Sequence, residues 1–275
     1  MADERAVQVH LLPELVPPGG LSGATAVVVD VLRATTTMIA ALAAGCTDVR
    51  PCRTIEEAKE LADGLGIGRA LLGGERGGVR IEGFDLGNSP LEYTAAVCRG
   101  RTLVMTTSNG TRALLRAAEA DRVLVAGFVN FSAVCARLRE DSRPVHLVCA
   151  GTDGAVTLED TLLAGALVED LCRHVDARLN DSARVARDSF EHHGSRLLAA
   201  LELSAGAREL LELGCRRDIE LAAEVDRFEL VPELRRDPLR VEPEPSGIVR
   251  SHWRKPTAGR RREAAVQRRD DSGAS

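Results

Sequence analysis

The sequence predicts an α/β fold: three layers, α/β/α, with a mostly parallel or mixed sheet flanked by helices. The first observation is that short apolar runs rich in β-branched residues recur along the chain, each followed by turn residues and a longer helical pattern. This alternation is typical of βα units. The second is the length of 275 residues, which is enough to bury a core without a metal or disulfide staple.

Each predicted element follows from this alternation. The strands are the apolar runs at 26–31, 48–51, 70–72, 102–106, 122–126 and 146–150. The helical patterns lie at 35–44, 55–65, 90–96, 110–118, 130–140, 158–170, 181–200 and 205–214. Because the carboxyl ends of parallel strands meet at one edge of a sheet, we expect ligand-binding residues just after the strands.

Composition excludes several classes of function. A net charge of −5 and 3% aromatic residues argue against a nucleic-acid or membrane-surface partner. No apolar run approaches the roughly 20 residues that a membrane span needs, and charge and proline interrupt the amino-terminal stretch where a signal peptide would lie. Seven scattered cysteines without CxxC spacing predict neither disulfides nor a zinc site. We therefore expect a cytoplasmic protein.

One domain is predicted over residues 1–242. Beyond Val241 the chain becomes rich in Pro, Gly, Ser and charge and poor in apolar residues. Such a segment buries too little surface to offset its ordering entropy. Residues 243–275 are therefore predicted to form a disordered, Arg-rich tail, with RNA binding by its arginines as the alternative.

The first candidate motif, residues 26–45, ends a buried strand in Asp30. Arg33 follows, and Thr35 and Thr36 open the next helix. An aspartate suits a hard cation, an arginine suits phosphate or sulfonate, and a helix amino terminus attracts anionic oxygens. The alternative is structural, with Thr35 as a helix cap and Arg33 in a surface ion pair.

The second motif, residues 71–93, is rich in glycine. Glycines let the backbone approach a ligand or adopt positive φ, and here they surround Glu75, Arg76, Asp85 and Asn88. The spacing matches neither GxGxxG nor a P-loop, so nucleotide binding is not predicted. The alternative is a glycine-rich hairpin, with Asn88 capping a helix that begins with proline.

The third motif, residues 104–117, leads from a strand into a helix through small polar residues. Their backbone N–H groups and hydroxyls are suited to cradle a phosphoryl group. The residues concerned are Ser108, Asn109, Gly110 and Thr111. Arg112 lies one step inside the helix. An ordinary Asn-Gly turn with a helix cap is the alternative.

The fourth motif, residues 148–171, places Glu159 and Asp160 in the first turn of an apolar helix. Adjacent carboxylates at a helix start can supply ligands for Mg²⁺, which takes one or two carboxylates, waters and substrate oxygens. Acidic residues also complement the helix dipole at this position. This motif alone does not separate the two explanations.

The histidines show no catalytic pattern. His192 and His193 lie in a predicted helix without a carboxylate or serine partner at fixed spacing, and the other four are isolated in the sequence. Motifs of the GxSxG and HExxH types are absent. We expect these side chains to be packed or solvated.

Taken in order, four motifs resemble those of the 2-phosphosulfolactate phosphatase (ComB) family: DVLRATTT, GGERGG…GFDLGNSP, TTSNGTRAL and AGTDGAVTLEDTLLAG. The stretch 195–232 resembles that family's carboxyl-terminal helices and terminal VP segment, so the resemblance spans about residues 5 to 242. The chain departs from the family at Ser195 and Arg196, where members commonly carry Gly and His before a Leu pair. It also has TTSNGT where many members have TTTNGT.

The resemblance implies a three-layer α/β fold and Mg²⁺-dependent hydrolysis of (2R)-2-phospho-3-sulfolactate to 3-sulfolactate and phosphate, a step of coenzyme M biosynthesis. The expected partner is a small anionic phosphate ester, and a homodimer is the oligomeric state considered. Two alternatives remain open. One is a phosphatase of another small 2-phospho-hydroxy acid, and the other is a non-catalytic anion-binding protein on the same fold.

These considerations assign roles to the candidate residues. The predicted Mg²⁺ ligands are Asp30, Glu75, Asp85, Glu159 and Asp160. The predicted catalytic residues are Asp30, Arg33, Asn109 and Arg112. The predicted substrate-binding residues are Thr35, Thr36, Arg76, Asn88, Ser108, Gly110 and Thr111.

Asp30 has a second possible role as a covalent nucleophile. A strand that ends in Asp is also found in haloacid dehalogenase phosphatases, whose motif is DxD. Position 32 is Leu in this chain, so the second aspartate, which would act as general acid, is missing. Attack by a metal-activated water is therefore favoured.

Overall fold

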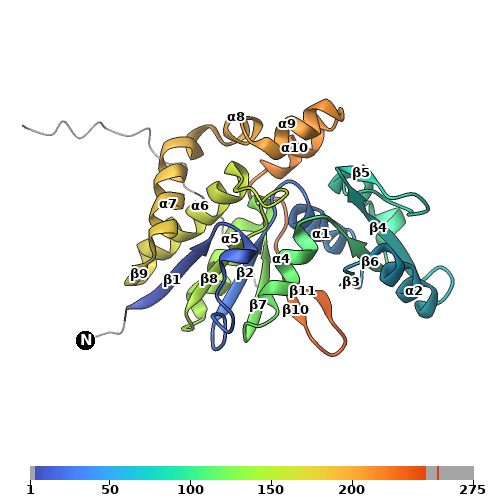
Figure 1. The fold of residues 1–275 in the computed structure, drawn as a ribbon, viewed down its shortest axis with the longest axis horizontal. Helices are drawn as coiled ribbons and strands as arrows, with labels where there is room; N and C mark the ends of the chain where they lie inside the picture. The colour runs from blue at the N-terminus through green and yellow to red at the C-terminus, as the bar shows by residue number, and fades with distance from the viewer. Residues whose placement is uncertain (1–3, 246–252, 254–275) are drawn as a thin grey trace, which may run out of the picture.

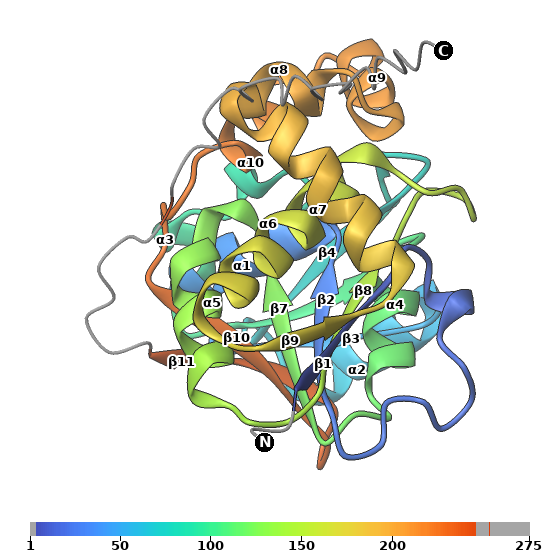
Figure 2. The same ribbon diagram turned by 90° about the vertical axis from the view of Figure 1, so that its left-hand side faces the viewer.

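The computed structural model describes residues 4–245 and 253, and its strands form one sheet with the order β5-β4-β6-β3-β11-β10-β7-β2-β8-β1-β9 (Figure 1). The strands are β1 Arg5–His10, β2 Thr25–Val29, β3 Asp48–Pro51, β4 Ala70–Arg76, β5 Val79–Arg80, β6 Thr102–Thr106, β7 Arg122–Ala126, β8 Val145–Cys149, β9 Ala177–Leu179, β10 Leu230–Arg235 and β11 Arg240–Pro245. Helices flank this sheet, which confirms the predicted α/β class (Figure 2).

Two parallel blocks make up most of the sheet, β4-β6-β3 and β7-β2-β8-β1-β9. The antiparallel hairpin of β10 and β11 joins the blocks. On one side Glu233 lies opposite Leu124 of β7, and on the other Val241 lies opposite Val49 of β3. The sheet is therefore mixed and mostly parallel.

All six predicted strands are present, and β3, β6 and β7 have the predicted bounds. Sequence reasoning missed β1, β5, β9, β10 and β11. Of these, β5 and β9 have only 2 and 3 residues and are partly or fully exposed, so no apolar run marks them. Strands β10 and β11 carry proline and charged residues, which disguise a strand in sequence.

The α-helices are α1 Ala34–Ala43, α2 Ile55–Leu65, α3 Ala95–Cys98, α4 Gly110–Ala117, α5 Phe131–Glu140, α6 Leu158–His174, α7 Asp181–His193, α8 Leu197–Glu202, α9 Ala205–Glu212 and α10 Arg216–Ala222. Short 3-10 turns occur at η1 Pro13–Leu15, η2 Pro90–Glu92, η3 Phe128–Asn130 and η4 Gly194–Arg196. Within the part of the chain that the structure describes, no helix is long and apolar enough to cross a membrane.

Two predicted helices are wrong in extent. The helix predicted at 90–96 is the turn η2 followed by the one-turn helix α3, because Thr94 is extended between them. The helix predicted at 181–200 is broken after α7. There Gly194 lies so close to the ring of Phe190 that a Cβ at this position would be 2.4 Å from a ring carbon. Helix α10 was not predicted.

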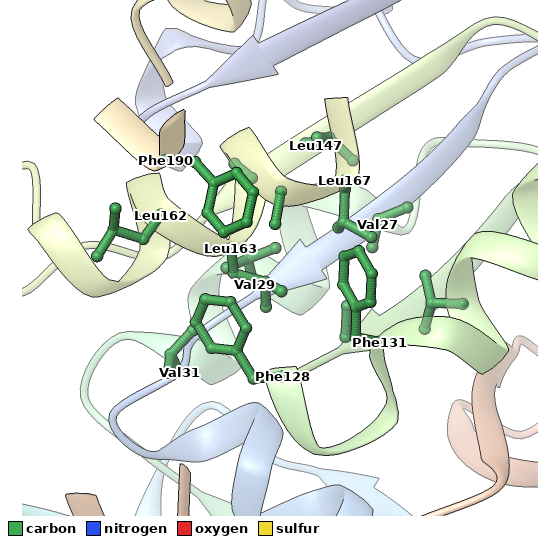
Figure 3. Packing of buried hydrophobic residues seen from close by; sticks show 14 of the residues in the cluster. Val27, Val29, Val31, Phe128, Phe131, Leu147, Leu162, Leu163, Leu167 and Phe190 are labelled. Carbon is green, nitrogen blue, oxygen red and sulfur yellow. The ribbon is translucent and has the colours of Figure 1, made fainter. Parts of the chain in front are cut away.

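Strand β2 explains how the core is divided into two layers. All its residues are buried, and side chains alternate between the two faces of the sheet. Val27 and Val29 pack with Phe128, Leu163 and their neighbours under α5 and α6, as Figure 3 shows. Ala26 and Val28 belong to the opposite cluster, which includes residues of α1 and α4. The chain therefore has helical layers on both faces.

Strand β11 runs to Pro245, past the predicted domain boundary at 242. Of the predicted tail, residues 246–252 and 254–275 lie outside the described residues. Trp253 is described, and its indole packs edge-on against Phe128, Phe131 and Phe190 at centroid distances of 6.0, 5.1 and 5.5 Å. One tail residue thus extends the core under α5 and α7.

We expect Trp253→Ala to lower the free energy of unfolding by about 2 kcal/mol, because it removes apolar area and three aromatic contacts. Trp253→Phe is the control that keeps an aromatic ring and should lose much less. Because Trp253 is the only tryptophan, its fluorescence in the wild type should be blue-shifted and should move red in urea. A native emission maximum at the position of exposed indole would contradict the packing.

A buried histidine pair joins β1 to β8. His10 Nε2 and His146 Nδ1 are 3.0 Å apart, and the rings stack with centroids 5.2 Å apart. Burial, together with the neighbouring His10, lowers the pKa of His146 to about 4. Burial likewise lowers the pKa of His10. The two histidines are far apart in the chain, so sequence reasoning did not predict this pairing.

The histidine pair should make stability depend on pH. The unfolded chain protonates His146 near its ordinary pKa of 6.5, whereas the folded chain does so only near 4. The contribution of neutral His146 to the free energy of unfolding is therefore fully present above pH 6.5. It should fall by on the order of 2 kcal/mol as the pH drops toward 4. Urea unfolding of His146→Asn should show a shallower pH slope in this window. The control, His174→Asn, changes a more exposed histidine and should keep the wild-type slope.

Candidate active site

A small polar pocket of about 80 Å³ lies where the carboxyl ends of β2, β4, β6 and β8 meet. Its floor comes from the loops after these strands, and its opposite wall comes from Gly206, Glu209 and Leu210 of α9. Strand-end loops supply most of its polar side chains. The pocket therefore occupies the sheet edge at which ligand-binding residues were expected.

Asp30 follows β2 and is held in a fixed orientation. Its Oδ1 accepts a hydrogen bond of 3.0 Å from the backbone N–H of Ala34. Its Oδ2 accepts no hydrogen bond from the described residues and faces the start of α4. A Cβ added to Gly110 would lie 2.6 Å from this oxygen. Glycine at position 110 thus lets α4 approach the carboxylate.

The two threonines after Asp30 serve the backbone. Thr35 Oγ1 donates to the carbonyl oxygen of Asp30 at 2.8 Å, and Thr36 Oγ1 donates to that of Val31 at 2.8 Å. Both side chains are buried and do not line the pocket. Thr35 is not the helix cap, since α1 has no side-chain cap. The threonines stiffen the loop that carries Asp30.

Glu75 ends β4 and bridges two loops. Its Oε1 accepts from the backbone N–H of Ser108 at 2.8 Å, and its Oε2 accepts from that of Gly78 at 2.8 Å. The side chain is buried and lines the pocket. Both oxygens therefore already have a donor, and Glu75 contributes fixed negative charge to the pocket.

Glu159 and Asp160 lie together at the start of α6, yet their surroundings differ. Asp160 accepts from the backbone N–H of Val31 at 2.8 Å and from that of Gly151 at 3.0 Å, so each of its oxygens has a partner. Glu159 is 1% exposed, and its Oε2 has no hydrogen-bond partner among the described residues. A Cβ on Gly206 would lie 2.7 Å from the other oxygen.

The carboxylates raise one another's pKa. The pKa of Asp30 is raised to about 7, chiefly by burial and also by the charges of Glu75 and Glu159, against the lowering effects of the Ala34 N–H and of Arg33. Burial raises the pKa of Asp160 well above its ordinary value, and Glu159 and Asp30 add to the effect. Burial also raises the pKa of Glu159. The site holds more buried negative charge than the nearby donors compensate.

Arg33 is the one cationic side chain that lines the pocket in the described part of the chain. Its Nη1 lies 2.7 Å from Oδ2 of Asp218 on α10, and its Nη2 donates to the carbonyl oxygen of Gly78 at 2.8 Å. The structural alternative placed Arg33 in a surface ion pair. Arg33 does form an ion pair, but the pair is buried because α10 covers it.

Asn109 and Arg112 lie at the mouth of the pocket. Asn109 lines it, and its Oδ1 accepts from the backbone N–H of Asp153 at 3.2 Å and from Arg112 at 3.1 Å. The Arg112 side chain is 46% exposed, pairs with Glu14 at 3.4 Å and is not part of the lining. Asn109 therefore fastens the β6–α4 loop to the β8–α6 loop.

Many of the predicted site residues do converge. Those that line the pocket are Asp30, Arg33, Glu75, Asn88, Ser108 and Asn109. Those that lie directly behind the lining, and contact it, are Gly110, Thr111, Glu159 and Asp160. Asn88 is 5% exposed, and its Oδ1 has no hydrogen-bond partner among the described residues.

Arg76 and Asp85 lie outside the pocket, contrary to the assignment made from sequence. Arg76 points away on the β4–β5 hairpin, where its Nη2 donates to Thr106 Oγ1 at 2.9 Å. Asp85 is exposed, and its Oδ2 accepts from the backbone N–H of Leu72 at 2.8 Å. Side chains alternate in direction along β4, so Glu75 faces the pocket and the adjacent Arg76 does not. Asp85 lies after β5, where its hydrogen bond from Leu72 holds the glycine-rich loop against β4.

Sequence reasoning also missed residues of the pocket region. Asp218 and Glu209 come from the carboxyl-terminal helices, where an acidic residue on an amphipathic helix gives no signal of a site. Asp153 lines the pocket with a φ of +50°, which is uncommon outside glycine. The only sequence feature that indicated a special role for Asp153 is its position in the glycine-containing turn 151–154.

A magnesium ion is compatible with this donor set. The described residues contain no group of three or more His, Cys, Asp or Glu side chains already arranged around a metal position. Oδ2 of Asp30 and Oε2 of Glu159 are carboxylate oxygens without hydrogen-bond partners there. Magnesium commonly takes one or two carboxylates and completes its shell with water and substrate oxygens. The donor types in the pocket therefore fit such a hard cation.

Comparison with known proteins agrees with the site. A sequence profile described as 2-phosphosulpholactate phosphatase matches residues 10–237. A probable 2-phosphosulfolactate phosphatase of Symbiobacterium thermophilum is 43% identical over 221 residues, which are 79% of this chain and 94% of that protein. Proteins with the same description from Thermotoga petrophila and Deinococcus radiodurans are 43% and 41% identical over 211 and 230 residues. These matches cover 76% and 83% of this chain and 88% and 92% of the relatives.

The matched region contains every residue that lines the pocket, whereas β11 and Trp253 lie beyond it. The relatives' shared description names a phosphoric monoester hydrolase, which agrees with the enzyme class expected from the sequence motifs. The profile match covers most of the chain, and the identities of about 40% are high enough to indicate common ancestry and not only a shared fold. The chain belongs to the 2-phosphosulpholactate phosphatase family.

Proposed function

We propose that this protein is a Mg²⁺-dependent phosphatase that hydrolyses 2-phosphosulfolactate to sulfolactate and inorganic phosphate, a conversion of the kind used in coenzyme M biosynthesis. One observation carries the magnesium requirement. The pocket is lined by four acidic side chains, Asp30, Glu75, Asp153 and Glu209, but only by one cation, Arg33. A substrate with phosphate, carboxylate and sulfonate groups would be repelled there unless a bound cation compensated the charge.

Asp30 and Glu159 are the proposed direct ligands, because each has a carboxylate oxygen that accepts no hydrogen bond from the described residues. Glu75 and Asp160 already accept backbone hydrogen bonds. They would act through water or by orienting the ligand side chains. When bound, Mg²⁺ would neutralise charge on the phosphoryl oxygens and make a coordinated water more acidic.

The protein's own donors would hold the phosphoryl group. Arg33 has further N–H groups besides the two that contact Asp218 and Gly78. The amino terminus of α4 lies beside Asp30 and directly follows the lining residues Ser108 and Asn109, and a helix amino terminus favours negative charge. Ser108 adds a hydroxyl in the lining. Catalysis would then consist of positioning and charge stabilisation.

The carboxylate of Asp30 is proposed to act as a ligand, with water as the nucleophile. Residue 32 is Leu, so no second carboxylate two positions on can protonate the leaving group. A quenched reaction should therefore contain no phospho-aspartate, as measured by mass spectrometry of the peptide that includes Asp30. Recovery of phosphate on Asp30 would show covalent catalysis instead.

A substrate panel tests the proposed activity. Phosphosulfolactate, phospholactate, phosphoglycolate and 2-phosphoglycerate should be compared with added Mg²⁺, with phosphate release as the measurement. We expect phosphosulfolactate to have the highest kcat/KM and EDTA to abolish its hydrolysis, because the acidic pocket needs a cation. Preference for another member of the panel would identify a different 2-phospho acid, and full activity in EDTA would refute the metal requirement.

Substitutions of the two proposed ligands test the site. Asp30→Asn and Glu159→Gln should each lower kcat/KM by about 10² or more and should raise the Mg²⁺ concentration needed for half-maximal activity. Asp85→Asn is the matched control, since Asp85 was a candidate by sequence but lies outside the pocket. Equal losses in Asp85→Asn and Glu159→Gln would show that the pocket is misassigned.

A further inference from the structure

Arg33 is held chiefly by Asp218, a residue that sequence reasoning missed. Oδ2 of Asp218 on α10 lies 2.7 Å from Nη1 of Arg33, and the Arg33 and Asp218 side chains are 5% and 3% exposed. The other carboxylate oxygen accepts from Ser89 Oγ at 2.6 Å. On the arginine, Nη2 donates to the carbonyl oxygen of Gly78 at 2.8 Å. Both the carboxylate and the guanidinium are therefore fixed from two directions.

We propose that Asp218 is a positioning residue that orients the Arg33 guanidinium toward the substrate in the pocket. The proposal rests on the proposed phosphatase function, in which Arg33 contacts the anionic substrate. Asp218 does not line the pocket and acts only through the arginine. Ser89 supports it by holding the carboxylate in the orientation that Arg33 requires.

The burial of the pair gives this contact its effect. A charge-assisted hydrogen bond in a site with little water is stronger and more directional than one on the surface. An arginine side chain that lacked this partner would have several rotamers available and would lose orientation. The pair thus supplies a fixed direction for the N–H groups of Arg33 that do not contact Asp218 or Gly78.

Asp218 also joins the two walls of the pocket. Arg33 belongs to the loop after β2, whereas Asp218 lies on α10, directly after α9, whose Gly206, Glu209 and Leu210 form the opposite wall. Ser89 follows Asn88, which lines the pocket. One buried carboxylate thus ties the β2 loop, the turn before η2 and the helical wall into a single arrangement.

A purely structural ion pair is the competing explanation, because breaking any buried pair destabilises a protein. The two explanations differ in kinetics. Loss of orientation should lower kcat, while binding of a simple anion to the still-charged arginine should change little. Loss of structure should lower thermal stability and affect both quantities together.

The central experiment compares Asp218→Asn with the wild type. We expect kcat to fall at least about 30-fold, while the Kd for inorganic phosphate in the presence of Mg²⁺, measured by calorimetry, stays within about fivefold. Asp170→Asn is the control, because Asp170 is a buried carboxylate that pairs with Arg139 at 3.6 Å and lies outside the pocket. A kcat for Asp218→Asn equal to that of the control would overturn the proposal.

Two further variants keep the proposal testable if Asp218→Asn folds poorly. Ser89→Ala retains the charge pair and removes one support, so it should lower kcat by a smaller factor than Asp218→Asn, without a change in KM. The double variant Arg33→Gln, Asp218→Asn should be no slower than Arg33→Gln alone, because Asp218 acts through Arg33. Additive losses would contradict this route.

A readout independent of phosphatase activity separates this proposal from the proposed function. Phenylglyoxal modifies accessible guanidinium groups, and peptide mass spectrometry can follow its reaction at Arg33 alone. The rate at Arg33 should rise at least about fivefold in Asp218→Asn and remain unchanged in Asp170→Asn. An unchanged rate in Asp218→Asn would refute the positioning role even if the wild type proved to be an active phosphatase. An inactive wild type would refute only the function.

Discussion

Burial of negative charge at the junction of the two parallel blocks is the constraint on which the site depends. Asp30, Glu159 and Asp160 are each less than 10% exposed, and burial raises the pKa of all three. Backbone N–H groups of Ala34 and Val31 offset part of this cost. The backbone N–H of Gly151 also donates to Asp160, whereas Oδ2 of Asp30 and Oε2 of Glu159 accept no hydrogen bond from the described residues. Under the proposed function, a cation bound in the pocket compensates the negative charge of these oxygens. The cation and the anionic substrate are therefore expected to bind together.

Two glycines set how closely the helices approach these carboxylates. A Cβ at Gly110 would lie 2.6 Å from Oδ2 of Asp30, and a Cβ at Gly206 would lie 2.7 Å from Oε1 of Glu159. The proposed direct ligands are therefore the two acids against which α4 and α9 press. A larger residue at either position would push α4 or α9 away from the carboxylate that it faces.

Local patterns in the sequence predicted the strand ends and their acidic residues, because an apolar strand followed by a polar loop is visible in one short window. They did not show which side chains of a loop turn inward. Glu75 and Asp85 look alike in a glycine-rich stretch, yet only Glu75 faces the pocket, since its place on β4 fixes its direction. Strands β10 and β11 and the partners of Arg33 were also missed. These depend on pairings between distant segments, such as Arg33 and Asp218, that no local periodicity encodes. The homodimer stays a prediction.

The carboxyl-terminal helices α9 and α10 complete the pocket that the strand-end loops begin. Of the five acidic and basic side chains in the lining, three come from those loops and Glu75 from the end of β4, but loops alone do not hold a guanidinium at a set angle. Helix α10 supplies the buried carboxylate of Asp218, and α9 supplies Glu209 and closes the pocket over Glu159. Because one hydrogen-bonded pair connects the loop after β2 to these helices, a shift of α9 and α10 would move Arg33 as well. If the proposed role of Asp218 is right, the position of α10 and the orientation of the arginine depend on each other.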